Sequence, residues 1–285
     1  MKTPSSRSES STVVAIASAS ALADVHTAFG TLARTSGVRP IVVTFGEHPE
    51  PVRTQHDRTV VLEGLVPHYL NNAVAALRLS SLPAIGWWRA PSLQGLLELC
   101  VLVDRLVLDV EDPAAVWSMV PELSTRTAVS DLRWTRLTRW RDLFAQFFDL
   151  PEVRDRSDAF SALNIVAGDA HMARLLAGWI VSRLPSGERL AVSIASDAEG
   201  AAIRSLALTG GEMTLSLRLL PNNVCLETTV ALPGTAPATR VVSTGDQALA
   251  TLMSEELRVR SRDQAFEDAI AAARALPGGH PGGNQ

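Results

Sequence analysis

The spacing of apolar residues constrains the fold of this chain more than any other feature, because it follows different rules in the two halves. In the first half, short apolar runs such as residues 41–45 alternate with segments in which apolar residues recur every three or four positions. Leu22, Val25 and Phe29 are an example of the wider spacing. Short runs are typical of strands buried on both faces, and the wider spacing is typical of amphipathic helices. We therefore expect an α/β domain with a mostly parallel sheet over residues 12–150.

The individual elements of this first domain follow from the same pattern. Asp112 before Pro113 is a helix start signal, because Asp caps the first turn and Pro fits the first helical position. The polar stretch 48–57 is expected to be a loop, and helices are expected near 22–32, 66–79, 92–103 and 138–148. Strands are expected at 12–17, 41–45, 59–62, 82–88 and 105–110.

The second half alternates with a period of two, which is typical of strands with one buried face. Residues 213–219 and 224–230 show this most clearly, with further strands expected at 190–195 and 203–208 and a short edge at 240–242. Helices are expected over 165–184 and over a long terminal segment that Asp246 would cap. The pattern predicts an α+β domain over 160–276, with an antiparallel sheet covered by helices on one face. We expect the boundary near 151–160, and disordered tails at 1–11 and 277–285.

Composition excludes several classes of function. The net charge is -4, whereas proteins that coat nucleic acid are normally basic. The only lysine is Lys2, and arginine cannot form a Schiff base, so pyridoxal-phosphate enzymes, Schiff-base aldolases and P-loop nucleotidases are excluded. Cys100 and Cys225 are too far apart in sequence for a zinc motif or a disulfide framework, which favours a reducing, cytoplasmic location. No apolar stretch is long enough to span a membrane.

The motifs that carry catalytic or cofactor chemistry are missing from the sequence. No Gly-x-Ser-x-Gly elbow is present, and the first strand runs into Ser18-Ala19-Ser20 rather than a glycine-rich dinucleotide loop. The six histidines show no metal-ligand spacing. We therefore predict no catalytic residues, no metal and no cofactor.

Two segments rich in tryptophan and arginine stand out. In the first, Trp87 and Trp88 precede Arg89 near a strand end, where neighbouring side chains point to opposite faces, so we expect that both are not fully buried. The second, residues 131–142, contains four arginines and two tryptophans. Both residue types are enriched at interface hot spots, which favours a partner-binding surface. The alternative is a helix with buried tryptophans and solvated arginines. Nucleic-acid binding is disfavoured by the acidic chain and by the flanking aspartates.

These residues resemble the glucose-6-phosphate dehydrogenase assembly protein family, OpcA. The resemblance rests on 82–88, on 131–141, and on the continuation 143–149, and the order and layout are similar over about 12–275. The resemblance implies a non-catalytic assembly factor and allosteric activator that binds glucose-6-phosphate dehydrogenase, promotes its active oligomer and supports NADPH supply in the oxidative pentose phosphate pathway. The partner-binding or motif residues it implies are Trp87, Trp88, Arg89, Asp131, Arg133, Trp134, Arg136, Leu137, Trp140 and Arg141.

The sequence departs from the family pattern at two places. It has Arg89-Ala90 where the family often has Pro-Gly after the two tryptophans, and Arg139 where the family usually has proline.

A second hypothesis comes from a different class of function. Arginines in the two segments would clamp a phosphate while tryptophans stack on a sugar ring, which would make the first domain a sugar-phosphate-binding domain or enzyme. The residues of this clamp would be Arg89, Arg133, Arg136 and Arg141.

Overall fold

The computed structural model describes residues 10–48, 51–56, 58–259 and 261–277. These residues fall into two compact units, and the chain passes between them more than once. The first unit comprises residues 1–135 and 247–263, and the second comprises 136–246 and 264–285. We expected a single boundary near 151–160. The contacts instead divide the chain after Thr135 and return the segment 247–263 to the first unit.

The first unit is built on a seven-stranded sheet in the order β3-β4-β2-β1-β5-β6-β7. All neighbouring strands are parallel except β3 and β4. The core strands carry uninterrupted apolar runs because both of their faces are buried. The strands are β1 (Ser11–Ala17), β2 (Val38–His48), β3 (Val52–His56), β4 (Thr59–Leu65), β5 (Ala84–Arg89), β6 (Arg105–Leu108) and β7 (Ala128–Asp131).

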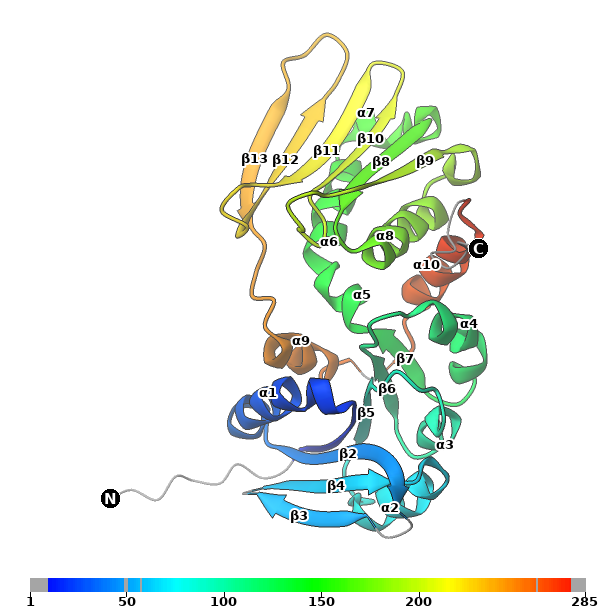
Figure 1. The fold of residues 1–285 in the computed structure, drawn as a ribbon. Helices are drawn as coiled ribbons and strands as arrows, with labels where there is room; N and C mark the ends of the chain where they lie inside the picture. Colours follow the sequence, from blue (N-terminus) through cyan, green and yellow to red (C-terminus); the bar gives the residue numbers. More distant parts are fainter. Residues whose placement is uncertain (1–9, 49–50, 57, 260, 278–285) are drawn as a thin grey trace, which may run out of the picture. The chain divides into compact units, whose positions relative to one another are not determined.

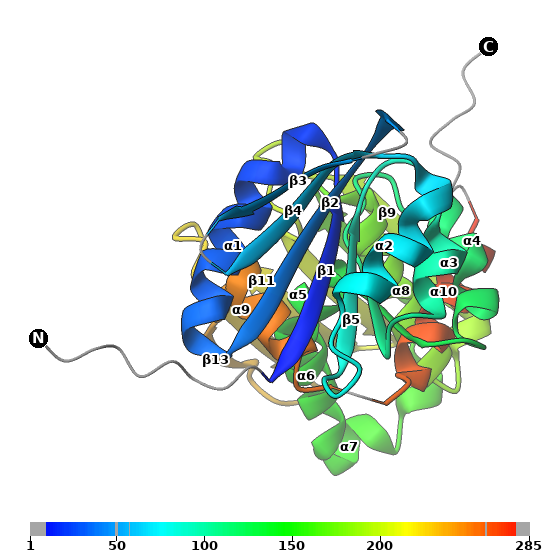
Figure 2. The same cartoon turned by 90° about the horizontal axis from the view of Figure 1, so that it is seen from below.

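Helices cover both faces of this sheet (Figure 2). On one side α1 packs against α9, and on the other lie α2, α3 and α4. The helix α4 begins next to Asp112, whose side chain accepts a hydrogen bond from the Ala114 backbone, as the start signal predicted. The helices are α1 (Leu22–Thr35), α2 (Leu70–Leu77), α3 (Leu96–Cys100), α4 (Ala114–Leu123), α5 (Leu132–Arg136, which continues into the second unit) and α9 (Leu249–Glu256).

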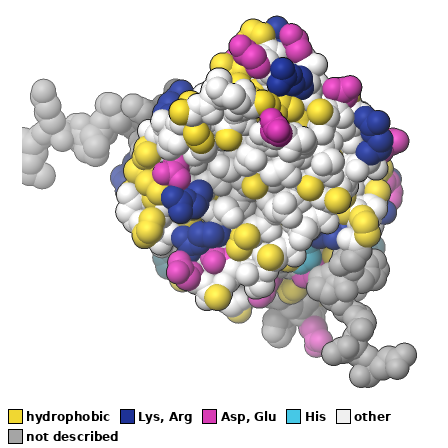
Figure 3. All heavy atoms as spheres, turned by 90° about the horizontal axis from the view of Figure 1, so that it is seen from above, with side chains coloured by type: hydrophobic (Ala, Val, Ile, Leu, Met, Phe, Trp, Pro, Cys, Tyr) yellow, Lys and Arg dark blue, Asp and Glu magenta, His cyan; other side chains and the backbone are white. Residues whose placement is uncertain are grey.

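The second unit contains a six-stranded sheet in the order β13-β12-β11-β10-β8-β9, which is antiparallel except for β8 and β9. Seen from the side that faces away from its helices, its surface shows mainly backbone and small or polar side chains (Figure 3). The expected edge strand at 240–242 is part of β13. The strands are β8 (Ala162–Ala167), β9 (Ala191–Ser196), β10 (Ser205–Gly210), β11 (Met213–Leu219), β12 (Cys225–Ala231) and β13 (Ala238–Ser243).

The helices of the second unit pack on the other face of this sheet (Figure 1). Gly178 lets α8 and α10 approach closely, because a Cβ there would lie 2.3 Å from the Ala269 carbonyl oxygen. Phe144 of α6 stacks edge-on against Trp179 of α8, with ring centroids 5.8 Å apart. The helices are α6 (Thr138–Gln146), α7 (Pro151–Arg154), α8 (Ala170–Arg183) and α10 (Gln264–Ala275).

Several expected elements were wrong in type or extent. Residues 165–167 belong to β8 rather than to a helix, because β8 pairs with strands on both sides and the helix starts only at Asp169, whose side chain caps Met172. The expected long terminal helix is two helices, α9 and α10, which belong to different units. The expected loop 48–57 contains β3, an exposed edge strand without apolar alternation. In the expected tails, Ser11 lies in β1, Ser10 bonds to the backbone of Ser36 and Gly37, and Pro277 lies in a turn, whereas 1–9 and 278–285 lie outside the described residues.

Candidate functional site

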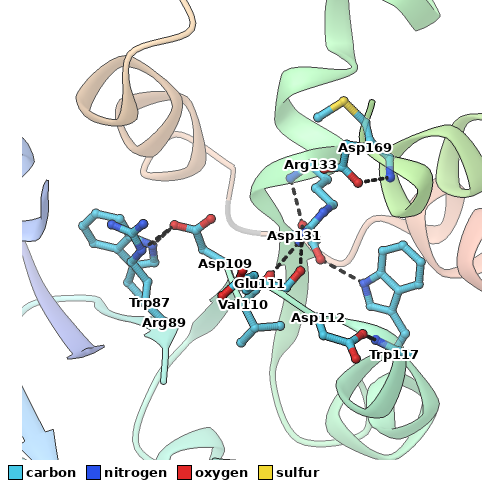
Figure 4. A network of polar contacts seen from close by, with 12 residues as sticks. Trp87, Arg89, Asp109, Val110, Glu111, Asp112, Trp117, Asp131, Arg133 and Asp169 are labelled. Atoms are coloured by element: carbon cyan, nitrogen blue, oxygen red, sulfur yellow. Dashed lines mark hydrogen bonds and ion pairs between the residues drawn. The ribbon is translucent and has the colours of Figure 1, made fainter. Parts of the chain in front are cut away.

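Several tryptophan, arginine and aspartate residues of the first unit lie at or next to the carboxyl ends of three neighbouring parallel strands (Figure 4). Arg89 ends β5, Asp109 follows β6, and Asp131 ends β7. Because parallel strands end at the same edge of a sheet, residues far apart in sequence meet there. We call this group of side chains the carboxyl-edge network; its members are Trp87, Arg89, Asp109, Trp117, Asp131 and Arg133.

Arg89 and Asp109 form the first part of the carboxyl-edge network. The Arg89 Nε donates to Asp109 Oδ2 at 2.9 Å, and the Trp87 indole N–H donates to the same oxygen at 3.3 Å. The Arg89 guanidinium also lies over the Trp87 ring at 5.4 Å, and it is 3.7 Å from Asp24 in the first turn of α1. These contacts bind the Arg89 side chain to neighbouring residues of the first unit and leave it only 15% exposed.

Asp131 forms the second part and is fully buried. Its carboxylate accepts hydrogen bonds from the Trp117 indole N–H at 2.9 Å and from the Arg133 backbone N–H at 2.8 Å. Burial raises the pKa of Asp131 to about 6, an effect that nearby Arg133 and the two hydrogen bonds oppose. The carboxylate therefore holds the end of β7 against α4.

Arg133 joins this second part to the loop that follows β6. Its guanidinium donates to the carbonyl oxygens of Val110 and Glu111, both at 2.8 Å, and lies 3.8 Å from Asp131. The planar group thus fixes two successive backbone carbonyls, a geometry that lysine could not reproduce. The arginine acts as an internal support for the strand ends.

A second buried cluster fixes the returning helix α9 to the same sheet. Glu256 accepts from Arg105 at 2.7 Å and from the Ser130 hydroxyl at 2.6 Å, and it also accepts from the Thr135 hydroxyl. In the same region the Trp134 indole donates to Asp263 at 2.7 Å. The first unit is therefore closed by a segment more than 100 residues further along the chain.

The remaining motif residues belong to the second unit. Leu137 and Trp140 are buried, the latter 8% exposed, which agrees with the alternative of a helix with buried tryptophans. Arg141 donates to Thr138 at 3.3 Å, and Arg139 donates to the Ser243 carbonyl at 3.1 Å, which holds the end of β13. Arg136 is half-buried, and its side chain takes part in none of the side-chain hydrogen bonds or ion pairs found among the described residues.

The expectation that Trp87 and Trp88 would not both be fully buried was wrong: both are 0% exposed. Their rings do point to opposite faces, but helices cover each face of the parallel sheet. Trp87 meets Phe29 of α1 at 5.8 Å and Trp88 meets Phe45 of β2 at 5.9 Å, measured between ring centroids. Trp134 is also buried, so the tryptophans support the fold and do not form an exposed surface.

Sequence reasoning missed several members of these clusters. Asp109 carried a usable signal, because it lies near the end of the strand predicted at 105–110, at the sheet edge where Arg89 and Asp131 also lie. Trp117 lies outside both motif segments. Glu256 and Asp263 gave no local signal, because their partners lie more than 120 residues away.

Two further features bear on ligands. Among the described residues, no group of three or more His, Cys, Asp or Glu side chains is placed to hold a metal ion, and no helix is long and apolar enough to cross a membrane. A cavity of about 730 Å³ lies at the opposite, amino-terminal edge of the first sheet. Its lining includes the serines Ser10, Ser11, Ser36, Ser80, Ser81 and Ser254 and the arginines Arg78, Arg105 and Arg258.

The chain is similar in fold to several solved structures, dehydrogenases among them. Levoglucosan dehydrogenase in complex with NADH aligns with a TM-score of 0.54 and 10% identity, covering 93% of this chain and 94% of that one. A super-repressor mutant of Gal80p from Saccharomyces cerevisiae aligns with a TM-score of 0.52 and 8% identity, covering 93% and 94%. At these identities the likeness concerns the fold alone.

The chain belongs to the OpcA family. Residues 127–270 match the family model for the C-terminal domain of the glucose-6-phosphate dehydrogenase subunit. Proteins named "Putative OxPP cycle protein OpcA" are 35% identical over 120 residues in Synechococcus elongatus and 30% identical over 124 residues in Synechocystis sp.. These matches cover 39% and 40% of this chain but only 27% and 26% of the relatives. The chain therefore matches about a quarter of the length of these relatives.

The residues at the end of β1 do not fit the dinucleotide that the fold suggests. Such a site needs glycines between the first strand and helix so that a pyrophosphate can reach the backbone. Here Ser18, Ala19 and Ser20 occupy the connection, part of which forms a short 3₁₀ helix. Asp24 places a carboxylate in the first turn of α1, where it would repel a phosphate.

Proposed function

We propose that this chain is a non-catalytic partner that binds glucose-6-phosphate dehydrogenase, promotes its active oligomer and raises its activity. The observation that carries the proposal is the match of residues 127–270 to a domain described as part of a glucose-6-phosphate dehydrogenase subunit. The names of the cyanobacterial relatives, which refer to the OxPP cycle, support the same pathway. The free thiols of Cys100 and Cys225 support a cytoplasmic location.

The contacts of the two motif segments support a structural role for most of their residues. Arg89 and Arg133 are held by Asp109, Asp131 and backbone carbonyls, so they are poor candidates for a phosphate clamp. The buried tryptophans likewise offer no face to a sugar ring. The motif therefore acts, in this proposal, by building the scaffold on which the partner surface is displayed.

An activator of this kind works by binding the active oligomer more tightly than the inactive form. A coupling of about 1–3 kcal/mol shifts that equilibrium by roughly 5- to 150-fold. The test is to mix the purified chain with its cognate dehydrogenase and to measure both complex mass and NADPH formation. We expect a complex and a faster rate, and the chain alone should produce no NADPH from glucose 6-phosphate and NADP⁺. The absence of both complex and rate change at micromolar concentrations would refute the proposal.

The serine-lined cavity of the first unit favours a second candidate function, which is compatible with the first. Serine hydroxyls together with the Arg258 side chain suit a small polyhydroxylated or phosphorylated metabolite, and about 730 Å³ is large enough for one. Calorimetry of the isolated chain with glucose 6-phosphate and 6-phosphogluconate tests this candidate. Heat of binding that is lost in Ser254→Leu supports the candidate, and no heat with either compound refutes it.

A further inference from the structure

The side of the second sheet that faces away from α6, α8 and α10 carries few charged and few large side chains. On the four central strands it consists of alanine, serine, threonine, asparagine, valine and cysteine, together with one charged pair. Its members on these strands are Ala162, Asn164, Val166, Ser205, Ala207, Thr209, Thr214, Ser216, Arg218, Cys225, Glu227, Thr229 and Ala231. Register assigns these residues to one face, because they pair with one another across neighbouring strands. We call this surface the open sheet face.

Burial confirms which side of the sheet is open. The alternate residues Leu163, Leu206, Leu208, Leu215 and Leu217 are at most 1% exposed. By contrast, Ala207, Ser216 and Thr229 are only partly covered. The face continues onto β9 through Ser193 and onto β13 through Val241, which is 54% exposed. No element of the second unit that the structure describes covers this side.

The charge pattern of the open sheet face suits a partner with the same pattern. Arg218 and Glu227 pair with each other at 2.8 Å, so their charges cancel within the face. In Figure 3 charged side chains lie mainly toward the margin, and small side chains and backbone fill the middle. Antiparallel sheets exposed to water normally carry polar and charged residues on that face. An uncharged face of small side chains instead fits another uncharged, flat surface.

The size of the face is also appropriate. Six strands about 4.8 Å apart and about six residues long cover roughly 600 Å² before side-chain relief is counted. Specific interfaces bury about 600–1,000 Å² per partner, so this face lies at the lower end of that range. Small side chains let two sheets stack at the usual distance of about 10 Å.

We propose that the open sheet face binds a second copy of this chain, related by a two-fold axis. A two-fold interface requires a self-complementary patch, and a neutral face of small residues meets that requirement. Alanine and serine bury little apolar area each, so the dimer is reversible and forms at micromolar concentrations. This proposal does not depend on the proposed function, because it concerns the chain alone.

Sedimentation velocity of the full chain tests the proposal. We expect the 30.5 kDa monomer to convert to a dimer as the concentration rises from about 1 to 100 µM. Ala207→Arg, in the middle of the face, places like charges in the interface and should weaken dimerisation at least about tenfold. Ala271→Arg, on the exposed side of α10, is the matched control and should dimerise like the wild type.

Melting temperatures establish that each variant is folded, and Ser216→Arg replaces Ala207→Arg if the latter unfolds. A chain that stays monomeric at 100 µM overturns the proposal. A dimer that folded Ala207→Arg or Ser216→Arg leaves unchanged overturns the assignment to this face. A monomeric chain whose binding to the dehydrogenase is lost in these variants assigns the face to that partner instead, and equally overturns the second-copy proposal.

Discussion

The Asp131 carboxyl group has a higher pKa in the folded chain than in the unfolded chain. Burial raises its pKa from 3.8 to about 6 in the folded chain. The folded state therefore keeps its proton to a higher pH than the unfolded chain does. The stabilisation from this proton is complete below pH 3.8 and is lost as the pH rises through 6.

We predict that the free energy of unfolding falls, through this group, by about 2–3 kcal/mol between pH 4 and 6.5. Asp131→Asn removes the titration while keeping an oxygen that accepts from Trp117. Urea unfolding of both proteins across this range isolates the effect, because all other groups are common to both. The free energy of unfolding of the wild type, measured relative to that of Asp131→Asn, should fall as the pH rises from about 4 to 6.5. Parallel curves would show that Asp131 titrates normally.

Arg133 and Arg136 lie three residues apart and should respond differently to truncation. Arg133→Ala leaves the Val110 and Glu111 carbonyls without their side-chain donor. It also removes the guanidinium 3.8 Å from the buried Asp131, whose hydrogen bonds from Trp117 and from the backbone N–H of residue 133 remain. We therefore predict a loss of about 2–4 kcal/mol in stability. Arg136→Ala removes no polar contact found among the described residues, so its melting temperature should change little. If Arg136 contacts the dehydrogenase, the same variant weakens activation. Measuring melting temperature and activation on both variants decides this, and unchanged values for Arg136→Ala would remove it from the partner site.

At the scale of elements, α9 is the helix whose attachment is most specific. Glu256 is buried and neutralises Arg105, so Glu256→Gln leaves an unpaired buried guanidinium. We predict a loss of about 3–5 kcal/mol in the free energy of unfolding. The adjacent, exposed Glu255→Gln is the control and should change stability by less than about 0.5 kcal/mol. Equal effects in chemical unfolding would mean that the buried cluster does not hold α9.

Helix α6 of the second unit packs mainly through Trp140 and Phe144. Trp140 is almost fully buried, so Trp140→Ala should cost about 3–5 kcal/mol and Trp140→Phe clearly less. Thermal unfolding measures this order. Alanine and phenylalanine variants of equal stability would contradict the assignment of Trp140 to the core.

Local patterns predicted most strands and helices because each buried element carries its own periodicity. Residues 213–219 alternate strictly, and the strand occupies those residues. The exceptions were elements whose burial is set elsewhere. The strand β3 is exposed on both faces and so shows no alternation, and β7 has only four residues. The run after Ala162 combines a strand and a helix that are both apolar, and only Asp169 marks their junction.

At the scale of the whole molecule, the sequence predicted two domain types but not the route of the chain between them. The return of residues 247–263 to the first unit depends on Glu256 meeting Arg105, Ser130 and Thr135, a long-range contact that no local pattern records. The sequence identified the tryptophan and arginine residues of the candidate site, but it did not predict that they stabilise the fold. Tryptophan and arginine suggested an exposed surface, whereas the parallel sheet buries both faces and turns the arginines toward internal carboxylates and carbonyls.

The central claim is that this chain activates glucose-6-phosphate dehydrogenase by binding it. The most direct test is to titrate the folded chain into a fixed concentration of the cognate dehydrogenase while following NADPH formation, with complex mass measured on the same samples. The account predicts a saturable rise in rate that ends at a fixed molar ratio and coincides with formation of a larger complex. A rate that stays constant up to about 10 µM, with the two proteins sedimenting separately, would contradict it.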